Sequence, residues 1–156
     1  MRIRIEGGKY NDQELSKLQD ESLREIIKKK IETKRNLFSN VSFEVEIDEK
    51  YNDVIFILPE ITSLIKQICG TKKGSGAPGK EFIAELDLDT LIKIAIFSKE
   101  KLRTKTLKKA VKTVLGICRS MGVKVEGKDP KILQSEIEEG LYDSKLKEWE
   151  GRWDES

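Results

Sequence analysis

The sequence predicts an α+β protein of two small domains: an N-terminal β-α-β-β-α domain with an antiparallel sheet, and a C-terminal, mainly helical domain. Three observations lead to this fold class. Alternating apolar residues mark strands early in the chain, a glycine- and lysine-rich stretch then breaks all periodicity, and helical spacing dominates afterwards. We expect the N-terminal domain at residues 1–70, a linker at 71–83, the C-terminal domain at 84–143 and an acidic tail at 144–156.

The N-terminal domain opens with a short strand, because residues 2–6 alternate between charged and apolar side chains before a glycine pair. An apolar stripe at helical spacing follows over residues 11–31, as one helix or as two helices that meet near Asp20. Alternation returns over residues 41–47 and again over 54–58. With the polar turn between them, these two runs predict a β-hairpin.

A helix and the linker complete this half of the chain. Pro59 suits a first helical turn, and apolar residues at helical spacing continue to Ile68. The next segment, TKKGSGAPGKE at residues 71–81, has no apolar periodicity and gathers the residue types of a linker. The linker residues are Gly74, Ser75, Gly76, Pro78 and Gly79.

The C-terminal half is predicted to be mostly helical. Apolar spacing over residues 87–96 predicts a helix, and a lysine-rich loop at 98–105 leads into the longest helix, residues 106–121. A short extended piece at 123–125 follows, and Asp129, with a proline next to it, caps a last helix. The tail, which contains two tryptophans, is expected to be either helical or frayed.

Charge is unevenly distributed along the chain, although the net charge is only +2. Residues 84–128 carry eleven lysines and arginines against five acidic residues, whereas residues 129–156 carry four against nine. A basic block of this kind predicts a surface that faces a polyanion, while the acidic end faces elsewhere.

Enzyme and metal sites find little support. The chain has no histidine, and GTKKGSG at residues 70–76 does not fit the phosphate-loop pattern. Cys69 and Cys118 lie in apolar helical patterns without metal-ligand spacing, so we expect reduced core thiols. We therefore expect no catalysis, no metal and no cofactor. The sequence also predicts neither a membrane span nor a secretory leader.

The longest predicted helix has two unlike faces. Gly116 lies nearly opposite the apolar side, surrounded by cations. A mid-helix glycine costs about 1 kcal/mol relative to alanine, and nothing in the apolar pattern requires one here. A bare backbone among cations predicts close approach to a phosphate-lined nucleic-acid groove. The apolar side consists of Leu107, Ala110, Val111, Val114, Cys118 and Met121.

A simpler interpretation of the same helix stays open. Lysine-rich helix faces are commonly just solvated, and a glycine such as Gly122 is commonly a left-handed helix cap. The basic loop with Lys99, Lys101 and Arg103 adjoins this helix and favours nucleic-acid binding.

Several strings resemble one known family. They are KGSGAPGK at residues 73–80, LIKIA at 91–95, KKAVKTVLGICRSMGVKVEGKDP at 108–130 and EGLYD at 139–143. Together they closely resemble large-subunit ribosomal protein eleven, the stalk-base protein, in its archaeal form. The resemblance is strong over residues 60–143, and the first strand and the hairpin also follow the family's order.

The resemblance implies a structural constituent of the large subunit of the cytoplasmic ribosome, docked on ribosomal RNA of the GTPase-associated centre. The long helix would lie in an RNA minor groove, and the loop at 98–104 would order against the RNA. The N-terminal domain would lie near the stalk proteins and the translational GTPases. The expected RNA-binding residues are Lys99, Lys101, Arg103, Lys105, Lys109, Lys112, Gly116, Ile117, Arg119, Ser120, Met121, Gly122 and Lys128.

The chain departs from the family pattern in two places. Family members usually carry a proline- and glycine-rich run after the first glycine pair, but residues 9–23 contain no proline. Ile117 stands where the family has a small polar residue. These departures keep an alternative open, a non-ribosomal paralogue that binds another RNA or an acidic protein partner.

Overall fold

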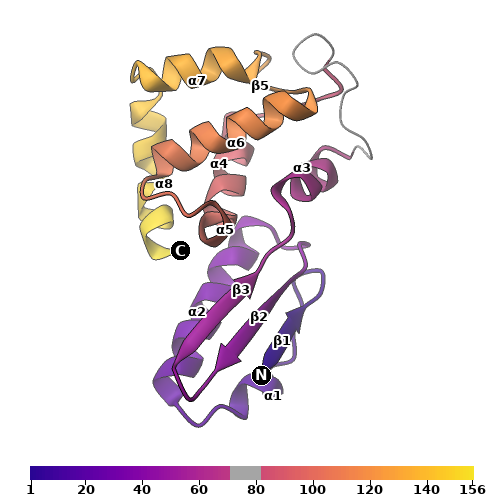
Figure 1. Cartoon of the computed structure of the whole chain (residues 1–156), viewed down its shortest axis with the longest axis vertical. Helices are drawn as coiled ribbons and strands as arrows, with labels where there is room; N and C mark the ends of the chain where they lie inside the picture. Colours follow the sequence, from indigo (N-terminus) through magenta and orange to yellow (C-terminus); the bar gives the residue numbers. More distant parts are fainter. Residues whose placement is uncertain (71–81) are drawn as a thin grey trace. The chain divides into compact units, whose positions relative to one another are not determined.

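The computed structural model describes residues 1–70 and 82–156 and divides into two compact units, Met1–Pro59 and Glu60–Glu155 (Figure 1). The expected linker residues Gly74, Ser75, Gly76, Pro78 and Gly79 lie outside the described part of the chain. Each unit buries an apolar core of its own.

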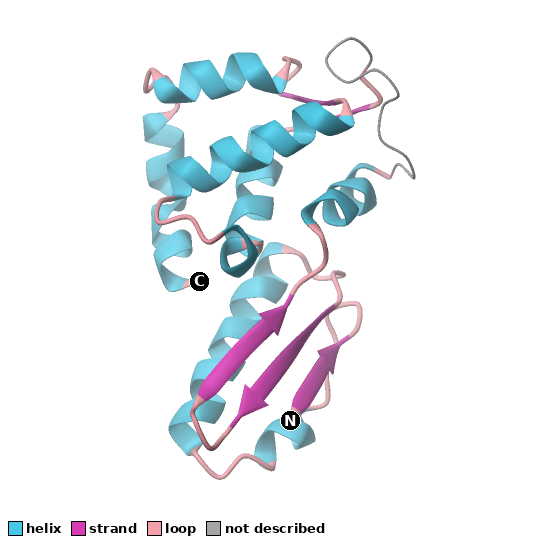
Figure 2. Cartoon of the chain, viewed as in Figure 1, coloured by secondary structure: helices cyan, strands magenta, loops and turns pink. Residues whose placement is uncertain are grey.

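The first unit combines an antiparallel sheet with two helices (Figure 2). The order across the sheet is β1 (Arg2–Ile5), β2 (Phe43–Asp48) and β3 (Asp53–Ile57). The helices are α1 (Asp12–Ser16) and α2 (Glu21–Leu37). Asp20 separates them, because its carboxylate caps α2 by accepting a hydrogen bond from the N–H of Leu23 at 3.2 Å. The two-helix alternative is therefore confirmed, with α2 six residues longer than the apolar stripe indicated.

The core of this unit forms from alternate strand residues and one stripe of α2, as the two periodicities predict. Lys30 and Lys34 of α2 place their ammonium groups over the ring of Phe56 on β3, at 6.0 and 5.2 Å from its centroid. These contacts bring α2 against the sheet. The fully buried residues of the unit include Ile3, Ile5, Ile27, Ile31 and Val45.

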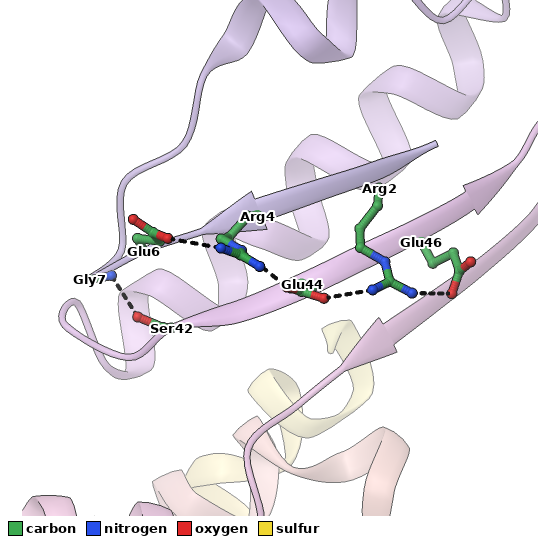
Figure 3. A network of polar contacts seen from close by, with 7 residues as sticks. All are labelled: Arg2, Arg4, Glu6, Gly7, Ser42, Glu44 and Glu46. Atoms are coloured by element: carbon green, nitrogen blue, oxygen red, sulfur yellow. Dashed lines mark hydrogen bonds and ion pairs between the residues drawn. The ribbon is translucent and has the colours of Figure 1, made fainter.

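The exposed strand positions carry a network of opposite charges (Figure 3). Arg2 lies 3.3 Å from a carboxylate oxygen of Glu46, and Arg4 lies 3.1 Å from Glu44. Next to this network the chain turns sharply at Gly8, whose φ of +80° suits glycine. A Cβ there would lie 1.8 Å from the carbonyl oxygen of Ser39, so no other residue fits without a backbone shift.

The second unit is mainly helical (Figure 2). Its elements in chain order are α3 (Ile61–Cys69), β4 (Ala84–Leu86), α4 (Leu88–Phe97), α5 (Lys99–Leu102), α6 (Leu107–Met121), β5 (Val123–Val125), α7 (Pro130–Glu138) and α8 (Asp143–Glu155). Asp87, Thr106 and Asp129 cap α4, α6 and α7 through their side chains. The helix starts expected at these residues are confirmed.

Three features of this unit differ from the sequence expectation. β4 was not predicted, because three residues are too few for alternation to show; it pairs in parallel with β5, the expected extended piece. The lysine-rich loop contains one helical turn, α5. The tail is helical, because Leu146 and Trp153 bury their side chains, 4% exposed each, and so hold α8 on the unit.

The helix α3 also belongs to the second unit. We expected the N-terminal domain to extend to residue 70, but α3 contacts α4 and α6 and falls within Glu60–Glu155. Its apolar stripe, Ile61, Leu64 and Ile65, is buried there. An apolar stripe shows that a helix packs against something, but not against which neighbour.

Candidate nucleic-acid interface

Helix α6 lies at the centre of the second unit and divides into a buried and a polar side, as its sequence predicts. Thr106 caps its first turn by accepting a hydrogen bond from the N–H of Lys109 at 3.2 Å. Gly122 ends it in the left-handed conformation, with φ +78°. All six residues predicted for the apolar side are buried, and Leu115 joins them.

Gly116 does not lie on a bare surface, which corrects the exposure expected from the sequence; its contact with RNA stays a prediction. It is half-buried, because α7 packs along this side of α6. The amide of Gln134 donates a hydrogen bond to the carbonyl oxygen of Lys112 at 2.8 Å and covers the glycine. A Cβ on Gly116 would come within 3.3 Å of the Gln134 nitrogen, so the Gln134 amide would have to shift slightly to admit a side chain.

Three of the expected RNA-binding cations form ion pairs with carboxylates of α7 or of Asp129, the residue that caps its start. The pairs are Lys112 with Glu138, Arg119 with Asp129 at 3.4 Å, and Lys128 with Glu136 at 3.0 Å. The hydrogen bond from Lys112 lowers the pKa of Glu138, and the hydrogen bond to Glu136 raises the pKa of Lys128. These cations are thus partly compensated within the protein.

Two cations of the α5 region also have protein partners. The Lys101 ammonium lies 3.0 Å from a carboxylate oxygen of Glu60. Lys99 donates a hydrogen bond to the carbonyl oxygen of Trp153 at 2.7 Å and lies over the tryptophan ring, 4.6 Å from its centroid. Lys99 therefore holds the C-terminal end of α8, where cations are favourable.

The remaining expected cations gather at the start of α6. Arg103, Lys105 and Lys109 are exposed, and within residues 1–70 and 82–156 no carboxylate pairs with any of them. Arg103 ends α5 in the left-handed conformation, with φ +56°. The N-terminal end of α6 adds its own partial positive charge to this cluster. We call these three residues the basic cluster; it is the strongest uncompensated positive charge among the residues expected to bind RNA.

The last turn of α6 is only partly available to a ligand. Met121 is 5% exposed and Gly122 is buried, so the Met121 side chain packs in the core instead of facing a partner. Ile117 is half-buried. Ser120 is exposed, but its hydroxyl donates a hydrogen bond to the carbonyl oxygen of Ile117 at 2.7 Å and keeps only acceptor capacity.

The sequence analysis missed the role of α7, although a signal was present. Gln134 and Glu138 are four residues apart and so share one face of α7. Leu133 and Ile137 mark the neighbouring buried face. A half-polar flank of this kind is compatible with solvent or with a neighbouring helix, and only the tertiary contact decides between them.

Both cysteines of the chain are free thiols in the structure. Burial raises the pKa of Cys118 to about 12 and that of Cys69 in the same direction, so both thiols stay protonated near neutral pH. In the described residues no group of acidic or cysteine side chains could hold a metal ion. Over the same residues, no helix is long and apolar enough to cross a membrane.

Comparisons with a family model and with curated proteins point to one family. Residues 58–125 match the family model described as ribosomal protein L11, RNA binding domain. Large ribosomal subunit protein uL11 of Saccharolobus islandicus (strain M.14.25) is 44% identical over 115 residues, which are 74% of this chain and 68% of that protein. The uL11 protein of Desulfurococcus amylolyticus is 39% identical over 113 residues, 72% of this chain and 66% of that protein.

Among solved structures, a chain of the large ribosomal subunit of Haloarcula marismortui is 38% identical, with a TM-score of 0.42; the match covers 44% of this chain and 97% of that one. The family-model match begins just before α3, ends at β5 and so includes all of α6 and the basic cluster. The family model and the two archaeal relatives confirm the resemblance to the archaeal form of this family. The chain belongs to the family of large ribosomal subunit protein uL11, a structural component of the ribosome and not an enzyme.

Proposed function

We propose that this protein docks on the ribosomal RNA of the GTPase-associated centre and forms the stalk base of the large subunit used by translation factors. Binding to large-subunit ribosomal RNA in the cytoplasm follows from the family. The particular RNA fragment and the stalk base are the finer proposal. The observation that carries it is the basic cluster of Arg103, Lys105 and Lys109, which lies inside the matched RNA-binding range without protein counter-charges among the described residues.

The proposed contact surface combines this cluster with the polar flank of α6, where Thr113 and Ser120 are exposed and the other residues are half-buried. Lys109 stands one helical turn before Lys112 and Thr113, and further along follow Gly116, Arg119 and Ser120. A-form RNA presents a wide, shallow minor groove that proteins recognise by its shape, its 2′-hydroxyl groups and its phosphates. A helix that offers cations at its start and small side chains further along suits such a groove.

The two units divide this function in the proposal. Residues 60–155 bind the RNA, which agrees with a family-model match that starts at residue 58. Residues 1–59 lie towards the stalk proteins and the translational GTPases. The proline-free segment at residues 9–23 contains α1 and the start of α2, so any contact there is made by these helices and the short loops beside them and not by a proline-rich run.

Binding of the full-length protein to the isolated stalk-base RNA fragment tests the proposal. We expect tight, salt-dependent binding that is at least about tenfold stronger than binding to an unrelated hairpin of equal length. Phosphate contacts alone would give the two RNAs equal affinity, so the difference measures recognition of the fragment itself. Equal affinity for both RNAs would overturn the proposal and favour a paralogue that acts on another RNA.

A further inference from the structure

The contacts between α6 and α7 pair a carboxylate with Lys112, one of the cations expected to bind RNA. Glu138 forms an ion pair with the ammonium group of Lys112, and the two residues are 26 positions apart in the sequence. Both side chains are reachable from solvent, with exposed fractions of 34% for Lys112 and 65% for Glu138. The pair therefore lies at the edge of the proposed contact surface and not in the core.

The α7 helix itself is firmly attached, which limits what can move. Leu133 and Ile137 are completely buried, and Gln134 is hydrogen-bonded to the backbone of α6. Only the tips of the Lys112 and Glu138 side chains can separate without disturbing this packing. Helix α7 packs against α6, so an incoming phosphate can exchange for the carboxylate while α7 stays in place.

We propose that Glu138 sets the RNA affinity of this face, by holding Lys112 in an ion pair that an RNA phosphate must break. The proposal rests on the RNA-binding function proposed above. When the phosphate takes the ammonium group, Glu138 keeps its negative charge beside it. The released carboxylate then attracts a cation from solution, which offsets the counter-ion that the RNA releases.

This exchange makes Lys112 behave differently from the basic cluster. Lys109, one turn earlier on α6, has no carboxylate to displace among the residues that the structure describes. Each such lysine adds its full contribution to the salt dependence of binding. Lys112 adds little to the salt dependence of binding as long as Glu138 is present. Glu138 therefore lowers the RNA affinity through its ion pair with Lys112, without a favourable contact of its own to the RNA.

The test measures binding of the full-length protein to the stalk-base RNA fragment over a range of salt concentrations. We expect Glu138→Gln to tighten binding about two- to fivefold at low salt and to steepen the salt dependence by about one unit. Glu139→Gln is the matched control, since it removes the same charge from the next residue, which is exposed and forms no ion pair within the described chain. We expect it to change affinity clearly less.

A second background separates the ion pair from the general effect of charge. With Lys112→Gln already present, Glu138→Gln should no longer tighten binding beyond the Glu139→Gln control. A gain that persists without Lys112, or equal effects of the two glutamate variants, would overturn the proposal. If Lys109→Ala weakens binding in that case, the proposed RNA-binding function still stands. Conversely, equal affinity for the fragment and an unrelated hairpin overturns the proposed function. The comparison of Glu138→Gln with Glu139→Gln, on either RNA, then still tests whether a phosphate displaces Glu138 from Lys112.

Discussion

Gly116 shows how a single residue can satisfy the packing of one helix against another. In the helix, the N–H of Gly116 faces the carbonyl oxygen of Lys112, four residues earlier. Gln134 donates a second hydrogen bond to that same oxygen. A Cβ on Gly116 would lie 3.3 Å from this amide nitrogen and so press on the hydrogen bond. The absence of a side chain at Gly116 thus leaves room for the packing of α7. An RNA that approaches this turn would also meet the Gln134 amide.

A double-mutant cycle tests the packing role of Gly116. Alanine gains about 1 kcal/mol of helix propensity over glycine, but it also pushes against the Gln134 amide and weakens a hydrogen bond worth about 1 kcal/mol. We expect Gly116→Ala to be nearly neutral in the free energy of unfolding, and to stabilise by about 1 kcal/mol when Gln134→Ala is present. Denaturant unfolding of the four proteins measures the coupling. Additive effects would show that Gln134 does not restrict this position.

The lysines of α6 give a second test at the scale of single residues. Lys109→Ala should lower the slope of binding against salt concentration by about one unit, because an unpaired cation is lost. Lys112→Ala should lower it by much less, because Lys112 is already paired with Glu138. Equal changes for both variants, measured on the same RNA fragment, would show that the ion pair does not persist in solution.

Among the elements, α8 illustrates how the acidic tail is attached. Asp89 of α4 accepts hydrogen bonds from the Lys145 ammonium at 2.9 Å and from the Trp149 indole N–H at 3.0 Å. Trp153 is buried further along the helix, next to Lys99. The carboxylate of Asp89 and the buried side chains of Leu146 and Trp153 thus hold a helix whose remaining surface is largely charged.

The attachment of α8 should weaken in acid. The hydrogen bond from Lys145 is the main cause that lowers the pKa of Asp89 below its ordinary value of 3.8. A lowered pKa means that the stabilisation is complete above that ordinary value and is lost as the pH falls through the lower, folded-state value. We expect the Trp149 fluorescence to change in this range.

The matched control for this titration is Asp89→Asn. Asparagine still accepts the bond from the Trp149 indole, but it has no charge to lose, so the acid-induced change should be absent. A titration that is the same in both proteins would mean that other carboxylates control the attachment of α8.

The elements also show what a sequence can and cannot predict. Local signals sufficed for the strands of the first unit and for the buried face of α6, and they gave the helix boundary near Asp20 as one of two alternatives. Which helix covers which face depends on contacts between distant segments, so the placement of α3, the pairing of β4 and the cover that α7 gives Gly116 were not predictable. Likewise, the sequence indicated which lysines belong to the interface, but not which of them form ion pairs with carboxylates of the protein.

For the whole molecule, the two compact units predict independent folding of the second one. Its core draws only on residues 60–155, including α3 and α8. A fragment of residues 60–156 should therefore unfold cooperatively and bind the stalk-base RNA within about threefold of the full-length affinity, a difference of less than 1 kcal/mol. A fragment that starts at residue 71 lacks α3 and should be clearly less stable, because Leu64 and Ile65 leave a cavity under α4 and α6. Thermal unfolding and RNA titration of both fragments measure this.

The charge network on the exposed side of the first unit has a consequence for how the protein meets RNA. Arg2 and Arg4 are matched by Glu44 and Glu46, and residues 1–59 as a whole carry eleven basic against twelve acidic side chains. Long-range attraction to a polyanion depends on uncompensated charge. The field of the RNA therefore attracts the basic cluster of the second unit and has little net effect on the first unit, so diffusional encounter favours contact through the second unit.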